Sequence, residues 1–279
     1  MINLANLITM AGRGRRFIDN GYLLPKPLIN IDGKPMIYRV IDSLPKSNKW
    51  IFIVREEHIN EFKLDKVILN KISDAIILVD KDLLGGASIF CAEKYLDLDE
   101  EVLISGCDNA FIFNQDKFDS LKSGDASCIL WTFTNDKRIA RSPNSWGYVV
   151  LDKNGQTIKD MSVKIPISDN PIEDHAVTAT FFLRSAKILY NSLRLMIRKN
   201  IKTNGEFYLD NLPIILNMMN EKSIIFDVDL YVGWGTPEEL HEFEKILHNY
   251  KLMNLDSTFN SNSEKKLWMK YFCDFYEEK

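Results

Sequence analysis

Short runs of apolar residues recur along the first half of the chain, and each is bounded by polar or turn-forming residues. Such runs, rich in Ile, Val and Leu, are typical of strands that are buried on both faces of a sheet. We expect strands at residues 3–10, 50–54, 75–79, 101–104, 127–133 and 148–151. Between the first of them lie stretches with helical apolar spacing, at residues 35–43, 57–70 and 86–95. This alternation predicts an α/β fold with a mostly parallel sheet flanked by helices, whose ligands bind at the carboxyl ends of the strands.

The alternation breaks after about residue 140. Residues 142–164 read as a hairpin with an Asp-Lys-Asn-Gly turn at 152–155. Further strands are expected at 175–183 and 224–234, and helices at 185–198, 204–219 and 237–253. The polar segment 255–266 is predicted to be a linker before an apolar-aromatic helix at 267–278, which either docks on its own domain or contacts another copy of the chain. We therefore expect one domain over 1–250, with halves at about 1–140 and 141–250, and a linker and C-terminal helix over 251–279.

Composition excludes several classes of protein. The 279 residues are 46% hydrophobic and 27% charged, which is enough apolar material for a core and excludes a disordered chain. The net charge of −4 argues against a nucleic-acid or acidic-membrane partner, because such binding needs clustered positive charge. We find no apolar run long enough to span a membrane and no signal-peptide pattern. The four cysteines lack metal-ligand spacing, so we expect reduced thiols and a cytoplasmic protein.

The clearest chemical pattern is the loop after the first strand, where residues 10–17 read MAGRGRRF and residues 25–27 read Pro-Lys-Pro. Small residues let backbone N–H groups approach an anion, and the arginines and Lys26 add positive charge. The flanking prolines restrict the direction of Lys26. A Rossmann fingerprint would need glycine in place of Phe17, and a Walker loop would need Gly-Lys-Ser/Thr. The pattern therefore predicts a phosphate-binding loop of another kind.

Three motifs in order carry a family resemblance: Gly12-Arg13-Gly14-Arg15-Arg16, Pro25-Lys26-Pro27-Leu28 and Gly33-Lys34-Pro35-Met36. Over residues 1 to about 245 the chain resembles the sugar-1-phosphate nucleotidyltransferases, which include glucose-1-phosphate thymidylyltransferases and bacterial choline-phosphate cytidylyltransferases. The resemblance implies a Rossmann-like sheet of the GT-A type with a β-rich insertion that binds the acceptor. The first half would then bind the nucleotide and the second half the acceptor.

The resemblance also implies a set of site residues. Met10, Ala11, Gly12 and Gly14 would wrap a nucleoside triphosphate, and Gly85 and Gly86 would lie near its base. Arg16 and Lys26 would neutralise the phosphates, and Asp108 would bind Mg²⁺. Lys164 would hold the acceptor phosphate, and Glu206 would lie on the acceptor side. From the residues alone, Asp108 at the carboxyl end of a strand suits a hard cation but could also cap the next turn, and Glu206 could be a solvated charge at a helix start. Thr236, in a Gly-Thr-Pro motif, is expected to cap the following helix.

Two departures leave the acceptor open. The family usually has a hydroxyl-binding glutamate where this chain has Val163, and often a second metal-binding aspartate where it has Gly233. Asp227 and Asp229 lie nearby, but side chains alternate along a strand, so neither need face the site. A phosphorylated polyol or amino alcohol is therefore an alternative acceptor to a hexose 1-phosphate.

The expected reaction is attack by an acceptor phosphate on the α-phosphorus of the triphosphate, with release of pyrophosphate. Alternatives are a cytidylyltransferase for a non-sugar phosphate and a catalytically silent nucleotide-sugar-binding protein, although the latter would be expected to lack Arg16 or Asp108. Glycosyl transfer would call for an Asp-x-Asp motif, and Cys107-Asp108-Asn109 has only one of those carboxylates. The Lys- and Asn-rich composition suits an enzyme of bacterial capsule or surface-polysaccharide synthesis.

Overall fold

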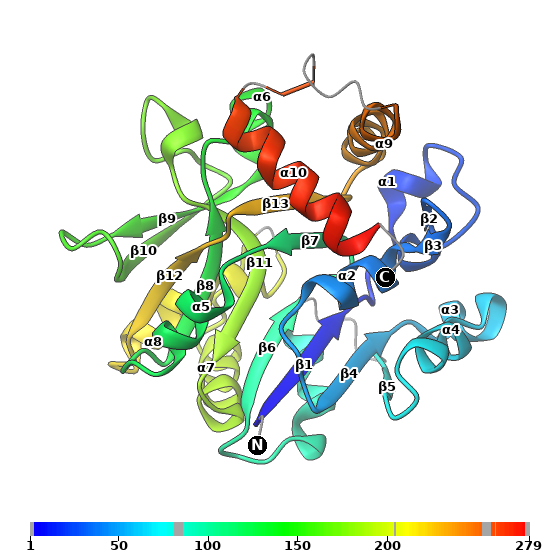
Figure 1. Cartoon of the computed structure of the whole chain (residues 1–279). Helices are drawn as coiled ribbons and strands as arrows, with labels where there is room; N and C mark the ends of the chain where they lie inside the picture. Colours follow the sequence, from blue (N-terminus) through cyan, green and yellow to red (C-terminus); the bar gives the residue numbers. More distant parts are fainter. Residues whose placement is uncertain (1–2, 81–85, 204, 253–257, 260, 277–279) are drawn as a thin grey trace.

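One mixed sheet organises the computed structural model, which describes residues 3–80, 86–203, 205–252, 258–259 and 261–276. In these residues nine strands form the sheet, along the path β10-β9-β11-β6-β1-β4-β5, with β8 and β12 branching from β11 (Figure 1). Four neighbouring strands are parallel: β1 (Leu4–Thr9), β4 (Lys49–Val54), β5 (Ile76–Val79) and β6 (Glu101–Ser105). The predicted α/β fold with a mostly parallel central sheet is confirmed.

The second half of the chain joins this sheet through one reversed strand. β11 (Ala176–Leu183) runs antiparallel to β6 and to β8 (Cys128–Phe133), and β12 (Ser223–Asp227) pairs in parallel with β8. The predicted hairpin is β9 (Gly147–Leu151) with β10 (Ile158–Val163). A bulge interrupts β11 between Val177 and Phe181, and Ala179 there has a left-handed φ of 59°. Because β11 pairs with β6 of the first half and with β9 of the second half, the two halves share one continuous sheet.

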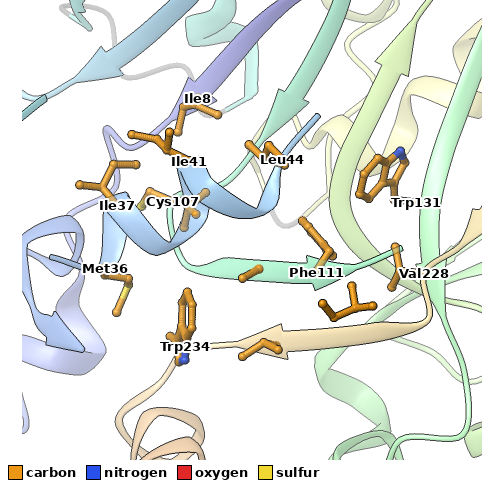
Figure 2. Close-up of a cluster of buried hydrophobic side chains, with 14 of the residues drawn as sticks. Ile8, Met36, Ile37, Ile41, Leu44, Cys107, Phe111, Trp131, Val228 and Trp234 are labelled. Carbon is orange, nitrogen blue, oxygen red and sulfur yellow. The ribbon is translucent and has the colours of Figure 1, made fainter. Parts of the chain in front are cut away.

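Helices cover both faces of the sheet, and each face has its own hydrophobic core. On one face lie α2 (Met36–Ser43), α4 (Leu64–Lys71), α5 (Gln115–Lys122), α9 (Pro237–Lys251) and α10 (Asn262–Phe275). Figure 2 shows part of this core, in which Ile37 of α2 and Phe111 and Trp234 are buried. The other face is covered by the 3₁₀-helix η2 (Gly86–Tyr95), α7 (Ala186–Arg198) and α8 (Leu212–Met218).

A short ribbon lies outside the main sheet. β7 (Asn109–Ile112) pairs with β13 (Leu230–Gly233), so the single strand predicted at 224–234 is in fact two strands, β12 and β13. They separate because the chain leaves the main sheet after Asp227, where Asp229 N–H donates to Ile112 O. A second, smaller hairpin is formed by β2 (Asn30–Ile31) and β3 (Lys34–Pro35).

Three predicted helices differ from the structure. The helix expected at 57–70 is two, α3 (Glu56–Phe62) and α4, because Lys63 between them has a left-handed φ of 56°. Of the helix expected at 204–219, residue 204 lies outside the described residues, and only Leu209–Asn211 (η5) and α8 are helical. Gly205 has a φ of 83°, which a helix does not allow. The predicted linker ends early, since Ser261 caps α10 by accepting from the Glu264 N–H.

The C-terminal helix packs on its own chain, against α2 and β7. Trp268, Tyr271 and Phe272 of α10 are buried in the core that it shares with α9. In the residues that the structure describes, no helix is long and apolar enough to cross a membrane.

Candidate active site

The predicted phosphate loop follows β1 at the carboxyl edge of the sheet. Met10 is buried, and its N–H donates to Ile53 O of β4, which fixes the start of the loop. Gly14, with a φ of 63°, is the residue before the short helix α1 (Arg15–Ile18), and a side chain there would be strained. Phe17 is buried beneath the loop, whereas Arg16 is exposed. The loop therefore has a buried anchor and presents Arg16 outward.

Lys26 and Asp108 meet at the centre of the site. Lys26 begins the 3₁₀-helix η1 (Lys26–Leu28), and Asp108 follows β6 by three residues. The Lys26 Nζ lies 2.7 Å from Asp108 Oδ2 and 3.5 Å from Gly235 O. Burial alone would lower the pKa of Lys26, but the Asp108 carboxylate more than offsets this and raises it. Segments far apart in the sequence thus bring a fixed cation and a carboxylate together.

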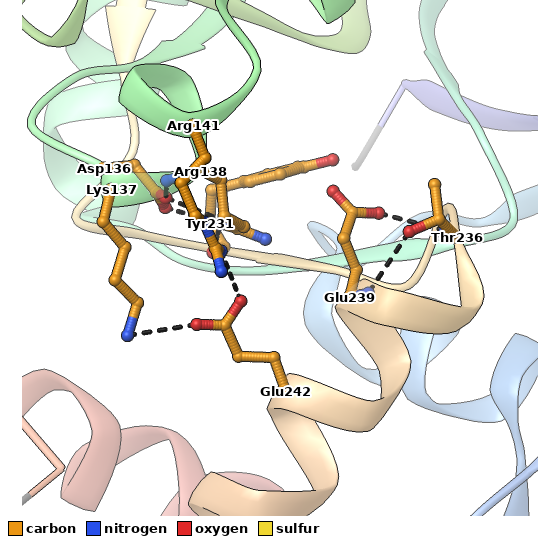
Figure 3. Close-up of polar contacts among 8 residues, drawn as sticks. All are labelled: Asp136, Lys137, Arg138, Arg141, Tyr231, Thr236, Glu239 and Glu242. Carbon is orange, nitrogen blue, oxygen red and sulfur yellow. Dashed lines mark hydrogen bonds and ion pairs between the residues drawn. The ribbon is translucent and has the colours of Figure 1, made fainter.

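A second carboxylate lies beside Asp108. A Cβ added at Gly235 would stand 3.1 Å from Glu239 Oε2 and 3.4 Å from Asp108 Oδ2, so both carboxylates approach the same point. Glu239 is held by the capping box of α9: Thr236 Oγ1 accepts from the Glu239 N–H, and Glu239 Oε2 accepts from the Thr236 N–H (Figure 3). The predicted capping role of Thr236 is confirmed. Burial and the nearby Asp108 raise the pKa of the Glu239 carboxyl.

The donors at this point suit magnesium. Mg²⁺ usually takes one or two protein carboxylates and completes its shell with water and substrate phosphates, and Asp108 and Glu239 offer such oxygens. Within the described ranges, no group of three or more His, Cys, Asp or Glu side chains could hold a metal by itself. The arrangement therefore fits a metal that binds together with phosphates.

Two cavities adjoin these residues. One, of about 740 Å³, is lined by Thr9, Ala11, Gly12, Arg13, Gly14, Arg15, Arg55, Asp80, Gly86, Ser88, Glu206 and Leu209. The other, of about 1,030 Å³, is lined by Arg16, Arg138, Arg141, Ser142, Asn144, Ser145, Trp146, Lys164, Tyr231, Gly235, Thr236, Glu238, Glu239, His241, Glu242 and Lys245. The structure thus brings Arg16 and Lys164 to one cavity and the glycines of the loop to the other.

Glu206 lies on the loop side of the site. It lines the cavity of Gly12 and Gly14, while Lys164 lines the other cavity. Gly86 shares the cavity with Glu206, and its N–H donates to Phe207 O at 2.7 Å. A Cβ on Gly86 would stand 2.6 Å from that oxygen, so only glycine fits there. Gly85 lies outside the described residues.

Lys164 ends the hairpin in an unusual conformation. Its φ is 62°, its N–H donates to Trp146 O, and its Nζ lies 5.9 Å from the centre of the Tyr208 ring. Asp210 lies near Lys164 and beside Gly147, where an added Cβ would be 3.0 Å from Asp210 Oδ2. Burial raises the pKa of Asp210 to about 6, although the Lys164 ammonium opposes this rise. This part of the second half, which was predicted to bind the acceptor, therefore holds the exposed Lys164 ammonium and the largely desolvated Asp210 carboxyl.

The two aspartates considered from the sequence lie elsewhere. Asp227 Oδ1 is 2.8 Å from His175 Nδ1 and accepts from Thr132 Oγ1 at 2.5 Å. Asp229 borders a separate cavity of about 320 Å³ between α9, α10 and β13. Neither lines the cavities of Arg16 or of the glycine loop.

Sequence reasoning did not point to four residues that the structure places in this region: Arg55, Arg138, Asp210 and Glu239. Arg55 is buried at the carboxyl end of β4, where it binds Glu57 through two N–H groups and donates to Ala11 O at 3.2 Å. Arg55 directly follows the strand predicted at residues 50–54, and this position at the carboxyl end of a parallel strand could have indicated a site residue. Asp210 fell in a segment predicted to be helical, and Glu239 resembled an ordinary acidic residue of a first helical turn.

Comparison with known proteins agrees with this geometry. Residues 6–124 match the model of the MobA-like NTP transferase domain. The bifunctional protein GlmU of Clostridium botulinum (strain Loch Maree / Type A3) is 24% identical over 272 residues, which are 93% of this chain and 56% of that protein. The GlmU of Clostridium novyi (strain NT) is 25% identical over 252 residues, 86% of this chain and 51% of that protein. The chain spans about half the length of the curated relatives that it matches.

Solved structures share the fold. The nucleoside-diphosphate-sugar pyrophosphorylase of Vibrio cholerae RC9 superposes with a TM-score of 0.69 at 18% identity, covering 86% of this chain and 99% of that one. The inositol-1-phosphate CTP transferase of T. maritima has a TM-score of 0.66 at 17% identity, covering 92% and 96%. These likenesses show that the chain has the fold of those structures. Residues 6–124 are thus similar to the MobA-like NTP transferase domain, and the predicted resemblance to sugar-phosphate nucleotidyltransferases is confirmed as a resemblance.

Proposed function

We propose that this protein transfers a nucleotidyl group from a nucleoside triphosphate to a phosphorylated small acceptor, such as a sugar 1-phosphate, and releases pyrophosphate. The observation that carries the proposal is the Lys26–Asp108 pair at the carboxyl edge of the sheet. Lys26 Nζ lies 3.5 Å from Gly235 O, and Gly235 lines the cavity that Arg16 and Lys164 also line. The GlmU proteins and the pyrophosphorylase structures support the same class of reaction.

In the proposed reaction, an acceptor phosphate oxygen forms a bond to the α-phosphorus, and the bond from that phosphorus to the β-phosphate oxygen breaks. An anionic acceptor needs no general base, so the protein contributes positioning and charge. Met10, Ala11, Gly12 and Gly14 form the loop around the triphosphate. Magnesium held at Asp108 would neutralise phosphate charge, with Glu239 beside it.

Three cations divide the phosphates among them in this proposal. Lys26, fixed by Asp108, neutralises the triphosphate near the site of transfer. Arg16, exposed on the same cavity as Lys164, stabilises the departing pyrophosphate, while Lys164 holds the acceptor phosphate. Glu206 and Gly86 border the nucleotide cavity, so we assign Glu206 to the nucleotide side rather than to the acceptor phosphate.

A cytidylyltransferase for a non-sugar phosphate is the second candidate. Val163 cannot bind sugar hydroxyls, and the acceptor half instead holds the buried Asp210 carboxyl near Lys164. The structural likeness to an inositol-1-phosphate CTP transferase favours including such acceptors. We place either enzyme in the cytoplasm, in the synthesis of a bacterial capsule or surface polysaccharide. The buried thiols of Cys107 and Cys128 support a reducing compartment.

The test is pyrophosphate release with Mg²⁺, for each of CTP, UTP, dTTP and GTP against glucose 1-phosphate, N-acetylglucosamine 1-phosphate, inositol 1-phosphate and choline phosphate. Release that requires one triphosphate and one acceptor together would support the proposal and name both substrates. Asp108→Asn is the negative control. If no pair gave release while the nucleotides still bound, the chain would be a silent nucleotide-binding protein.

A further inference from the structure

Arg138 is held rigidly at the border of the candidate active site. It lies in α6 (Lys137–Arg141), whose first turn is capped by Asp136. Asp136 Oδ1 accepts from Arg138 Nε at 2.9 Å, Asp136 Oδ2 accepts from Nη2 at 2.6 Å, and Nη2 also donates to Tyr231 O at 2.8 Å. The guanidinium carbon lies 4.8 Å from the centre of the Tyr231 ring (Figure 3). These contacts fix the plane and the direction of the guanidinium.

The remaining nitrogen of this guanidinium faces Gly233. A Cβ added at Gly233 would stand 2.9 Å from Arg138 Nη1 and 3.2 Å from the Tyr231 hydroxyl. Real Cβ atoms do not come that close, so any side chain at this position would displace Nη1 or the tyrosine ring. The absence of a side chain at Gly233 is therefore what lets Arg138 occupy its place.

That place is next to the Lys26–Asp108 pair. Gly233 of β13 lies directly opposite Asn109 of β7, and the N–H of the next residue, Trp234, donates to Asp108 O at 2.8 Å. Arg138 lines the same cavity as Arg16, Lys164 and Gly235. The guanidinium thus reaches the end of the ribbon that carries Asp108, at the position where the resembled family often has an acidic metal ligand.

We propose that Arg138 is a phosphate-binding residue of the transfer site, with Nη1 donating to a phosphate oxygen beside Asp108. The inference rests on the proposed function. A planar guanidinium suits phosphate oxygens, and one already fixed by Asp136 needs no rearrangement when charge builds up in the transition state. Nη1 is suited to this task because Asp136 and the Tyr231 carbonyl already engage the other two nitrogens. The Glu239 carboxylate on the same cavity wall offsets part of the positive charge of Arg138. Arg138 would therefore act on a phosphate as a directed hydrogen-bond donor more than as a source of net charge.

The experiment measures kcat, KM for both substrates and the Mg²⁺ concentration for half-maximal rate, using the substrate pair found above. Arg138→Gln should lower kcat about 10²-fold, as loss of a preorganised donor does, with smaller changes in KM. Because it also removes a cation near Asp108, it should lower the Mg²⁺ concentration for half-maximal rate. Arg138→Lys should restore part of kcat. Arg194→Gln is the matched control, since this exposed arginine of α7 pairs with Glu93 of η2 and lines neither cavity.

Gly233→Ala tests the same inference with the Arg138–Asp136 pair left intact. The methyl group should displace Nη1 and lower kcat about tenfold, at a temperature where the variant remains folded. Unchanged kcat and Mg²⁺ dependence in folded Arg138→Gln and Gly233→Ala, with only a lower Tm, would overturn the proposal and leave Arg138 with the structural role of joining α6 to β13. A wild type inactive with every substrate pair would overturn the proposed function and this inference together, whereas an active wild type with unaltered variants overturns the inference alone.

Discussion

At the scale of single residues, the site is built from opposite charges that already satisfy one another. Lys26 and Asp108 are 2.7 Å apart, so each is stabilised before any ligand arrives. Bound phosphates would give Lys26 a new partner and leave the Asp108 oxygens to a cation. The pair thus keeps both groups in place at little cost in free energy, as expected of a preorganised site.

Arg16 has no such support, since it is exposed on a four-residue helix. Arg16→Ala should lower kcat by a factor on the order of 10² to 10³, because charge developing on the pyrophosphate would lose a donor. Steady-state pyrophosphate release checks this, with Arg194→Ala, at an exposed arginine that lines neither cavity, as control. A rate within a few-fold of wild type would show that Arg16 has been given the wrong role.

Asp210 predicts how stability depends on pH. Its folded-state pKa of about 6 lies above the ordinary value of 3.8, so the folded protein binds the extra proton and loses stability as pH rises between these values. Asp210→Asn should remove this loss and raise the free energy of unfolding above pH 6 by about 1–3 kcal/mol, the lower figure allowing for partial solvent exposure.

Urea unfolding of wild type and Asp210→Asn at a series of pH values measures the difference. It should grow from about pH 4 to pH 6 and then stay constant. A difference independent of pH would mean that the Asp210 carboxyl keeps its ordinary pKa.

How far the sequence predicts the site depends on where each residue stands. Lys26 was predicted from the Pro-Lys-Pro pattern and Asp108 from its place after a strand, both with the help of the family resemblance, and the structure brings the two within 2.7 Å of each other. Glu239 and Arg138 could not be found, since β13 brings them to Asp108 only by pairing with β7, a contact between residues more than 100 positions apart. No local pattern records that pairing.

At the scale of elements, the buried Arg39 connects the C-terminal helix α10 with the turn between β2 and β3. Arg39 of α2 donates to Phe275 O at the end of α10 and to Asp32 O after β2, and it lies 3.6 Å from the centre of the Tyr276 ring. The carbonyl groups that accept from Arg39 belong to two segments far apart in the sequence. Neither their positions nor the apolar pattern of the sequence predicts that these segments meet. α10 is therefore a structural part of the domain.

Arg39→Met should keep the bulk of the side chain but leave these buried carbonyls without a donor. We expect the free energy of unfolding to fall by about 2–4 kcal/mol, with α10 more open to proteolysis. Denaturant unfolding and limited trypsin digestion check this, with Arg194→Met as the surface control. Unchanged digestion would mean that the apolar face of α10 suffices to hold it.

Strands that form separate, continuous apolar runs were predicted well, and the ribbon of β7 and β13 was not. β1, β4, β6 and β8 are buried on both faces, and such runs are hard to mistake. β7 and β13 are four residues each, and β13 continues the apolar run of β12 without a glycine or proline between them. The point where one run divides into two strands is decided by the partner strand, which the sequence does not mark.

At the scale of the whole molecule, the shared sheet predicts that the two halves unfold together. A triphosphate with Mg²⁺ at about 100 times its Kd should stabilise the folded state by about 2.7 kcal/mol and raise Tm by roughly 4–8 °C. Calorimetry should show one transition that shifts as a whole. Two transitions, of which only one responds to nucleotide, would show that the halves are independent.

The reversed strand β11 also has a consequence for the order in which the protein is made. β6 needs Phe181, Phe182 and Leu183 to cover its second edge, and these leave the ribosome about 80 residues after β6 itself. Until then the nascent chain presents an apolar strand with unpaired N–H and C=O groups, which favours aggregation. A fragment ending at residue 140 should therefore be insoluble when expressed alone, and synthesis of the full chain should depend on chaperones more than its modest length suggests.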